Sequence, residues 1–137
     1  MSCKSLIYAT TTTPSSVVAS ATLPLATTIR RRGCDINLGG NAVTLTDTGS
    51  NYYLVTGSAT FTAPAAGVVS LTLQQNGAAV SGATASTIIT TATTETRSLS
   101  FSAIVRTFNS RGIDVLSILN SGVAATFSNI SIAVVKL

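Results

Sequence analysis

The chain has 137 residues, a length that suits one domain able to bury about two-thirds of the surface of its unfolded form. Eight lysines and arginines stand against four acids, a formal net charge of +4, yet charged residues make up only 9% of the chain, far below the roughly 25% of an ordinary globular domain. So few charges cannot cover the surface of a monomer, and large exposed apolar patches mark association sites. We therefore expect an obligate oligomer.

The chain contains no histidine, which excludes Ser-His-Asp and Cys-His catalysis and His-based metal sites. The acids Asp35, Asp47, Glu95 and Asp114 lack the local clustering of a calcium loop. A glycosidase-like pair of carboxylates brought together by the fold stays open as a minor alternative. We expect no enzyme, with no catalytic residue, no cofactor and no metal.

Two cysteines, Cys3 and Cys34, have neither the spacing of a zinc site nor the number of a disulfide framework, so we expect reduced or partly buried thiols. No run of 18 apolar residues predicts a membrane-spanning helix, and no membrane partner is expected. The polar run at 10–16 interrupts any apolar core of a signal peptide, so none is predicted.

The composition favours an all-β fold, because serine and threonine are abundant and no segment carries the apolar stripe of an amphipathic helix. Residues 1–16 predict an N-terminal arm or edge strand that ends in a turn at Pro14. Residues 17–22 and 25–30 predict short strands on either side of Pro24.

Three hairpin signals follow. Residues 36–46 contain Gly39-Gly40-Asn41 between two apolar runs, which predicts a tight hairpin. Residues 52–75 alternate cleanly on both sides of a turn at 63–66 and predict the best-defined hairpin of the chain. Asn76-Gly77 predicts a type I′ turn that folds residues 78–80 back on 72–75.

The next segment, after a second break at Ser81-Gly82, predicts a strand over 83–90 and then a polar loop. Residues 97–106 alternate between apolar and polar side chains and predict a further strand. Eight to ten short strands at this spacing fit an antiparallel sandwich, jelly roll or barrel.

Two segments near the C-terminus, 113–119 and 123–137, are apolar on both faces. In 123–137 the parity of the positions places Ile130 on one face and Phe127 on the other. A strand covered from both sides in an antiparallel protein indicates a subunit interface. The predicted interface residues are Ile113, Val115, Leu116, Ile118, Ile130, Ile132 and Val134.

The only charge run is Arg30, Arg31 and Arg32, beside a turn at Gly33. It has two interpretations. The first is a contact with an acidic partner surface; the second is a solvated turn, or arginines that pair with Asp35 and neighbouring carboxylates across a subunit boundary. The second is the more common situation. Nucleic acid is not expected, because no stacking aromatic residues lie nearby in the sequence.

Five motifs in order resemble the C1q/TNF-like jelly-roll domains of bacterial and phage structural proteins. They are N-L-x-G-N-A-V-x-L at 37–45, G-x-x-Y-Y-x-V at 49–55, T-F-T-x-P-x-A-G at 60–67, L-x-Q-N-G-x-x-V-x-G-A-T at 73–84, and the closing V-V-K-L at 134–137. The resemblance spans residues 28–137. It implies a homotrimer of ten-stranded jelly rolls, packed around a threefold axis through apolar strands.

Exosporium glycoproteins of this type carry a collagen-like stalk, which this sequence lacks. The resemblance therefore favours a trimeric phage capsid decoration or head-fibre protein, assembled in the host cytoplasm and bound to the major capsid protein or another virion protein. Residues 1–32 would be the anchoring segment and 33–137 the jelly-roll knob. Deleting residues 1–16 should then leave a soluble trimer that no longer binds particles.

Two alternatives stay open. One is a bacterial cell-surface or spore-coat trimer with the same fold. The other is a knob that recognises a host-surface glycan or receptor through its loops at 47–51 and 91–96.

Overall fold

The computed structural model describes residues 4–46, 50–107 and 113–137, which form eleven strands and no helix. One sheet contains β1 (Leu6–Thr11), β2 (Ser15–Val17), β3 (Thr27–Arg32), β6 (Tyr52–Thr62), β9 (Arg97–Arg106) and β11 (Ala125–Lys136). The other contains β4 (Ile36–Gly39), β5 (Ala42–Leu45), β7 (Gly67–Gln75), β8 (Ala78–Ile89) and β10 (Asp114–Asn120). No helix in the described part of the chain is long and apolar enough to cross a membrane.

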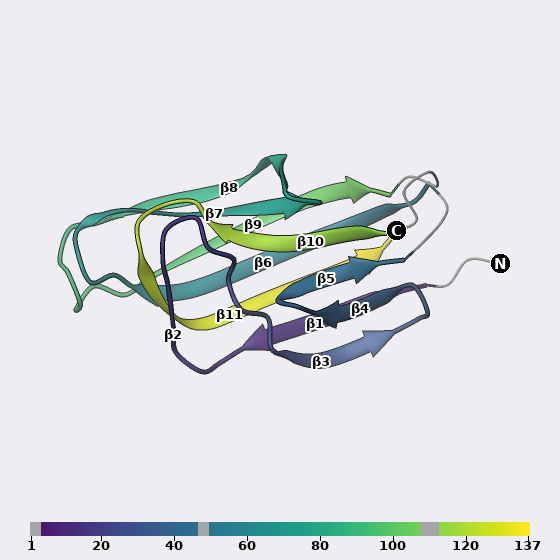
Figure 1. Ribbon diagram of the computed structural model, residues 1–137, viewed down its shortest axis with the longest axis horizontal. Helices are drawn as coiled ribbons and strands as arrows, with labels where there is room; N and C mark the ends of the chain where they lie inside the picture. The colour runs from purple at the N-terminus through teal and green to yellow at the C-terminus, as the bar shows by residue number, and fades with distance from the viewer. Residues whose placement is uncertain (1–3, 47–49, 108–112) are drawn as a thin grey trace.

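The two sheets form an antiparallel jelly-roll sandwich, as predicted. Their strand orders are β3-β1-β11-β6-β9, with β2 also pairing with β11, and β4-β5-β10-β7-β8. Strands β6, β9 and β11 each follow a strand of the opposite sheet, so the chain crosses repeatedly between the layers. Figure 1 shows the strands running along the longest axis of the molecule. β1 begins beside the end of β11, since Leu6 pairs with Val135.

The core lies between the sheets and is built by period-two alternation. In β6, the positions with odd numbers from Tyr53 to Phe61 are buried, while Tyr52, Leu54, Thr56 and Ser58 are exposed. Three residues of β7, Val69, Leu71 and Leu73, face the same core. The predicted alternation of both strands is confirmed, but the predicted hairpin at 52–75 is wrong. β6 and β7 lie in opposite sheets and do not pair, so the turn at 63–66 carries the chain from one layer to the other.

Two turns have the positive backbone angles that the sequence indicates. Gly40 and Asn41, between β4 and β5, have φ values of 60° and 61°. Asn76 and Gly77, between β7 and β8, have φ values of 54° and 81°. Both pairs match the type I′ hairpin turn, in which φ is positive at the two central residues.

The predicted break at Ser81-Gly82 is instead a bulge within one long strand. β8 runs through it, while its register against β7 shifts between Thr72 and Gln74. The extra residues are accommodated by Gly82, whose φ is 79°. A bulge keeps the strand in the sheet but increases its local twist.

A second bulge corrects the predicted faces of β11. Phe127 pairs with Phe61 and Asn129 pairs with Thr60, so Ser128 is an extra residue. As a result Phe127 and Ile130 both point into the core, although their positions differ in parity. The ring centroids of Phe61 and Phe127 lie 5.5 Å apart, within the range of a favourable aromatic pair.

The first 32 residues contribute strands to the same sandwich. β1 lies between β3 and β11, and its residues Ile7 and Ala9 belong to the core. Any anchoring role of residues 1–32 must therefore be carried by surfaces of strands that are part of the jelly roll. That role stays a prediction.

The stretch before β3 runs beside β10. Thr22 bridges Leu119, and the backbone amide of Leu23 donates to the carbonyl oxygen of Ile118 at 2.8 Å. Asn120, fully buried, fixes this corner: its Nδ2 donates to the carbonyl oxygens of Val17 at 3.1 Å and Val123 at 3.0 Å.

Candidate functional site

The outer surface of the six-stranded sheet, called here the broad face, carries no charge over its central rows. Cross-strand partners point to the same side of a sheet, so the register of β1, β11, β6 and β9 defines these rows. The outward side chains are Leu6, Tyr8, Thr10, Ser131, Ala133, Val135, Leu54, Thr56, Ser58, Ser100, Ser102 and Ile104.

One row of the broad face is apolar. Leu6 pairs with Val135, Val135 with Leu54, and Leu54 with Ile104, so four aliphatic side chains form a line across four strands. The exposed fractions are 39% for Val135, 36% for Leu54 and 60% for Ile104. Tyr52, next to the row, is 52% exposed. Charges flank the row: Arg32 pairs with Leu6 at its β3 end, and the guanidinium carbon of Arg106 lies 5.8 Å from the centroid of the Tyr52 ring. An apolar line with charges only at its margin has the properties of an association surface.

The rest of the broad face is lined with hydroxyl groups. Ser58 and Ser131 share a hydrogen bond of 2.9 Å between their side-chain oxygens. Around them lies a shallow depression of about 490 Å³, bordered by Tyr8. Of the described residues that line it, Tyr8 is the only one with a titratable side chain. The depression can offer hydrogen bonds but no acid–base pair.

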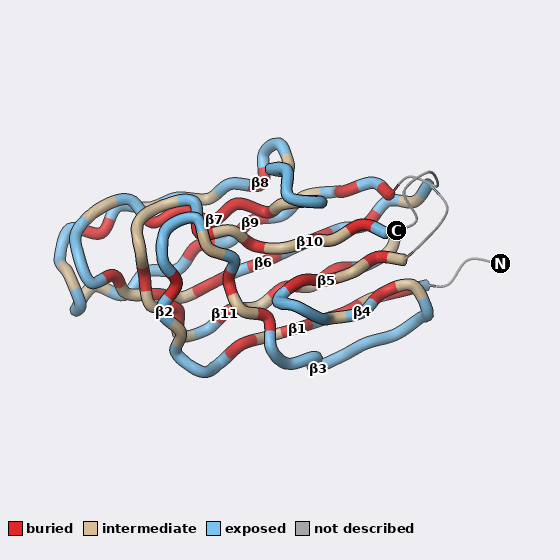
Figure 2. The backbone as a smooth tube through the Cα atoms, viewed as in Figure 1, coloured by how far each residue is buried: buried red, intermediate tan, exposed pale blue. Residues whose placement is uncertain are grey.

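The three consecutive arginines lie on β3, an edge strand, and not in the predicted turn. All six residues of β3 are exposed, as Figure 2 shows in pale blue along the whole strand. Arg30 pairs with Tyr8 and Arg32 with Leu6, so both point to the side of the broad face. Arg31 points the other way, and its Nε donates to the carbonyl oxygen of Ile36 at 2.7 Å.

Within one subunit Asp35 pairs with a lysine and not with these arginines. Its carboxylate lies 3.7 Å from the Nζ atom of Lys136, whose side chain is 6% exposed. Within the described ranges no carboxylate forms an ion pair with Arg30, Arg31 or Arg32. The arginines lie on a strand and not in a turn, whereas their pairing with Asp35 and other carboxylates across a subunit boundary stays a prediction.

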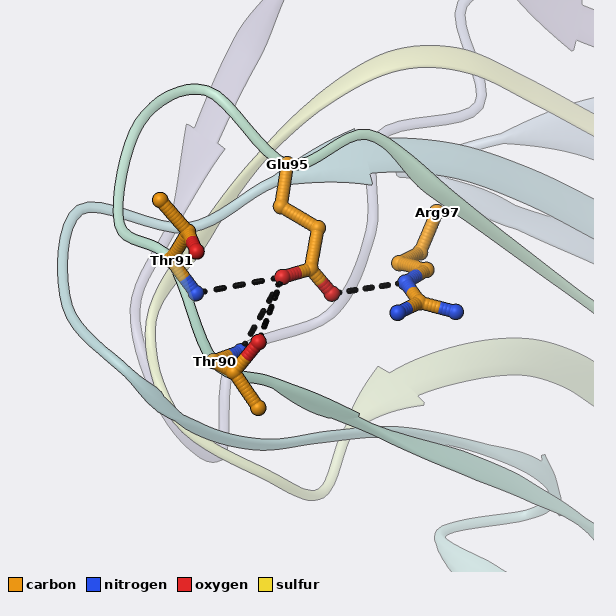
Figure 3. Close-up of polar contacts among 4 residues, drawn as sticks. All are labelled: Thr90, Thr91, Glu95 and Arg97. Carbon is orange, nitrogen blue, oxygen red and sulfur yellow. Dashed lines mark hydrogen bonds and ion pairs between the residues drawn. The ribbon is translucent and has the colours of Figure 1, made fainter.

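A third feature is the loop between β8 and β9. The carboxylate of Glu95 accepts hydrogen bonds from the backbone amides of Thr90 and Thr91, at 3.2 Å and 3.1 Å, and from the Thr90 hydroxyl at 2.9 Å. Its other oxygen accepts from Nε of Arg97 at 2.7 Å (Figure 3). These donors, Arg97 first, lower the pKa of Glu95 from about 4.5 to about 2.

Five of the seven predicted interface residues lie inside one subunit. Leu116, Ile118, Ile130, Ile132 and Val134 are at most 2% exposed and belong to the core between the sheets. They cannot form a contact between subunits, so their assignment is corrected. Their strands looked apolar on both faces because each buries one face and shows scattered apolar residues on the other.

The two remaining predicted interface residues lie at or near the surface of the other sheet. Ile113 precedes β10 and is 56% exposed, while Val115 points outward from β10 and is partly buried. Their interface role stays a prediction. The predicted recognition loop at 91–96 is the turn around Glu95. In the other predicted recognition loop, 47–51, residues 47–49 lie outside the described residues.

Sequence reasoning missed the apolar row. The sequence did contain a signal: Leu54 and Ile104 are aliphatic residues on faces of β6 and β9 that carry mostly Ser and Thr. A lone aliphatic residue on a polar face is common and indicates nothing by itself. Only the register shows that four such residues are neighbours.

The expectation of thiols is wrong for Cys34, which is disulfide-bonded. Cys3 lies outside the described residues. No cluster of three or more potential metal ligands occurs in 4–46, 50–107 or 113–137.

Comparison with known proteins finds similarity in structure but not in sequence. No family model and no curated protein sequence matches the chain. Among solved structures, murine APRIL aligns with a TM-score of 0.69 and 16% identity, covering 97% of this chain and 98% of that chain. Eiger TNF from S. frugiperda gives 0.68 and 14%, covering 97% and 90%.

Two further likenesses come from different kinds of protein. The globular domain of zebrafish complement 1qA aligns with a TM-score of 0.63 and 10% identity, covering 95% of both chains. The PRD1 vertex protein P5 gives 0.59 and 16%, covering 100% of this chain and 99% of that chain. At such low identity these matches show the fold alone. The chain thus has the jelly-roll fold of TNF and C1q domains.

Proposed function

We propose that this chain is a non-enzymatic structural protein of a virion, a trimeric capsid decoration or head-fibre protein that projects a jelly-roll knob. The observation that carries the proposal is the broad face, whose central rows carry no charge and include the apolar row Leu6, Val135, Leu54 and Ile104. A monomer with this face would expose contiguous apolar surface to water.

Assembly through the broad face has a clear driving force. Covering the exposed part of each aliphatic side chain in the row contributes of order 1 kcal/mol. A stable interface covers about 800 Å² per partner, so it must extend over the hydroxyl-lined rows as well. Those rows suit the purpose, because small uncharged side chains are desolvated with less penalty than charges.

The virion role is supported by two independent considerations. The sequence motifs resemble jelly-roll domains of phage structural proteins, and the PRD1 vertex protein P5 matches this chain over nearly the full length of both. In this proposal residues 1–32 attach the protein to the shell. Residues 33–137 form most of the knob.

The distribution of charged residues agrees with a molecule that has one attached end and one outward end. Arg32, Asp35 and Lys136 lie at the end of the sandwich where β1 begins. Among the charged described residues, only Glu95 and Arg97 lie toward the opposite end. The connection from β8 to the start of β9, which carries them, lies on the far side from the C-terminus in Figure 1. An attached end and an outward end are thus chemically different.

Two measurements test the proposal. Light scattering should give three times the mass of one chain at micromolar concentration, and a monomer mass would exclude the trimer. Purified protein should co-sediment with empty shells assembled from a capsid protein encoded near its gene. A gene neighbourhood of spore-coat or cell-surface proteins would favour the bacterial surface alternative.

One observation favours a second candidate function, recognition of a host-surface glycan or receptor. The loop at 90–96 is held by Glu95 in a fixed conformation at the outward end, and a pre-organised loop loses little entropy on binding. Glycan-array binding that disappears in Glu95→Ala would support it. A glycan array without any signal would argue against recognition and leave the structural role as the remaining candidate function.

A further inference from the structure

We propose that the edge strand β3 binds an extended acidic segment of the shell protein, with Arg30 and Arg32 as the recognition residues. The inference rests on the proposed attachment to a shell and assigns the contact within residues 1–32. In the described part of the chain, strand β3 has one neighbour, β1, and its other edge is open to a partner strand. An open edge is a template for strand addition.

The two arginines are available for a partner. Among the described residues, the guanidinium of Arg30 donates a hydrogen bond only to the carbonyl oxygen of Ile29, through Nη1 at 2.9 Å, and that oxygen is an acceptor without full charge. Arg32 has no hydrogen bond or ion pair within the described ranges. A guanidinium reaches its strongest pairing with a carboxylate, in a bidentate geometry.

The spacing of the arginines selects the shape of the ligand. Arg30 and Arg32 are two residues apart on one side of a strand, so their Cα atoms are about 7 Å apart. Acidic residues at alternate positions of an extended segment have the same repeat. A strand added to β3 would therefore bring each of two such acids opposite one arginine.

The contact is short because β3 is bulged. Its register against β1 shifts between Tyr8 and Ala9, and Ile29 is the unpaired residue. On the arginine side of the bulge, regular strand geometry covers Arg30, Arg31 and Arg32. A partner segment therefore needs only two acidic residues within three positions to pair with both Arg30 and Arg32.

A second copy of this chain is not the expected occupant. If two β3 strands paired in antiparallel fashion around Arg31, Arg30 of each would lie opposite Arg32 of the other, and directly opposed like charges are destabilising. Nucleic acid has some support, because Tyr8 lies beside Arg30 and is 40% exposed. Two free guanidinium groups are nevertheless few for tracking a phosphate backbone.

The test uses the full chain and two labelled nine-residue peptides of identical composition. One has three glutamates at alternate positions among threonines, and the other has three glutamates separated from each other by two threonines, so that it never offers acids at positions i and i+2. Fluorescence anisotropy should show the alternating peptide binding roughly tenfold more tightly, since each charge-assisted pair is worth about a factor of ten. Equal binding of the two peptides would overturn the proposal.

Variants locate the contact. Arg30→Gln and Arg32→Gln should each lower the affinity for the alternating peptide by about tenfold, and Arg30→Lys should lower this affinity less. The matched control is Arg97→Gln, which removes one charge at the opposite edge of the same sheet and should leave binding unchanged. Loss of binding in Arg97→Gln to the same extent would mean unspecific charge attraction and would overturn the inference.

Three outcomes distinguish a failure of this inference from a failure of the proposed function. If a single-stranded oligonucleotide displaces the peptide and binds more tightly, the edge is a nucleic-acid site and the inference is wrong. If Arg30→Gln/Arg32→Gln still co-sediments with shells, the inference is wrong but attachment stands. If the wild-type protein binds the alternating peptide but no shell, the proposed function is wrong.

Discussion

Gly57 of β6 lies opposite Phe101 of β9, and the phenyl ring occupies the space where a side chain at position 57 would be. A Cβ atom built on Gly57 would come within 2.5 Å of Cζ and 2.8 Å of Cε1 of Phe101. Such distances do not occur in packed proteins. The ring is 8% exposed and belongs to the core, so glycine here is required for packing.

Gly57→Ala should therefore lower the free energy of unfolding by about 1–3 kcal/mol, the usual penalty of overpacking. Urea unfolding measures it. Gly39→Ala is the matched control, because Gly39 also lies in a strand, but a Cβ atom there would have no neighbouring atom within 4 Å. A loss of similar size in both variants would indicate a general strand effect. Phe101→Leu should partly rescue Gly57→Ala.

Two neighbouring valines separate the core from the assembly surface. Val134 is fully buried, whereas Val135 lies in the apolar row and is 39% exposed. Val134→Asp should unfold the subunit, since a buried unpaired charge costs more than about 4 kcal/mol. Val135→Asp should leave the circular dichroism spectrum folded but shift the mass in light scattering from trimer to monomer.

A trimer mass for Val135→Asp would contradict assembly through the broad face. In that case Ile104→Asp gives an independent check, because Ile104 lies in the same row on another strand. If both Val135→Asp and Ile104→Asp still form trimers, the broad face is not the trimer interface.

Asn120 should be the most sensitive buried polar residue. Asn120→Ala leaves the carbonyl oxygens of Val17 and Val123 without their donor, and each unsatisfied buried group costs about 1–3 kcal/mol. Thermal unfolding should show the loss. Asn129→Ala, on an exposed position of β11, should change stability by less than about 0.5 kcal/mol; equal effects would argue against the buried network.

The stability of the loop at 90–96 should depend on acid pH. The pKa of Glu95 in the folded protein is about 2, below its usual 4.5, so the carboxylate stabilises the fold fully above about pH 5. This contribution declines as the pH falls through 4.5 and is lost near pH 2, because the folded state then gains no advantage from the charge.

The test compares wild-type protein with Glu95→Gln. Wild-type protein should have the higher melting temperature at pH 7, and the difference should vanish toward pH 2. A difference that stays constant between pH 7 and pH 2 would show that ionisation of Glu95 does not matter.

Deleting residues 1–16 should abolish folding, contrary to what the sequence suggests. The deletion removes β1, which lies between β3 and β11 and supplies Ile7 and Ala9 to the core. We expect insoluble protein on expression, whereas deleting only residues 1–3 should yield soluble protein. A soluble, trimeric product without residues 1–16 would mean that β3 can pair with β11 directly.

The strands were predictable where one face is buried and the turn residues are distinctive. β9 has the predicted bounds, and the Asn76-Gly77 turn has the predicted backbone angles. The alternation of β6 and β7 reports burial directly, because the side chains of a strand point alternately to core and solvent.

The assembly surface was not predictable, because it depends on register. Ile132 and Val134 are apolar for the sake of the subunit's own core, and a sequence cannot distinguish that core from a subunit contact. The row that includes Leu54 and Ile104 joins strands that are distant in sequence. The arginine edge was visible as a charge run, but its strand context and the partner of Asp35 required the fold.

The single extra residue in β11 has a consequence for how this chain tolerates change. Ser128 separates two halves of the strand whose inward-facing positions differ in parity. The extra residue shifts the alternation by one position, so that the core-facing residues of both halves point to the same side. Deleting it would turn Ile130, Ile132 and Val134 toward the solvent or force Phe127 out. This strand should therefore tolerate substitutions between similar residues better than the insertion or deletion of a single residue.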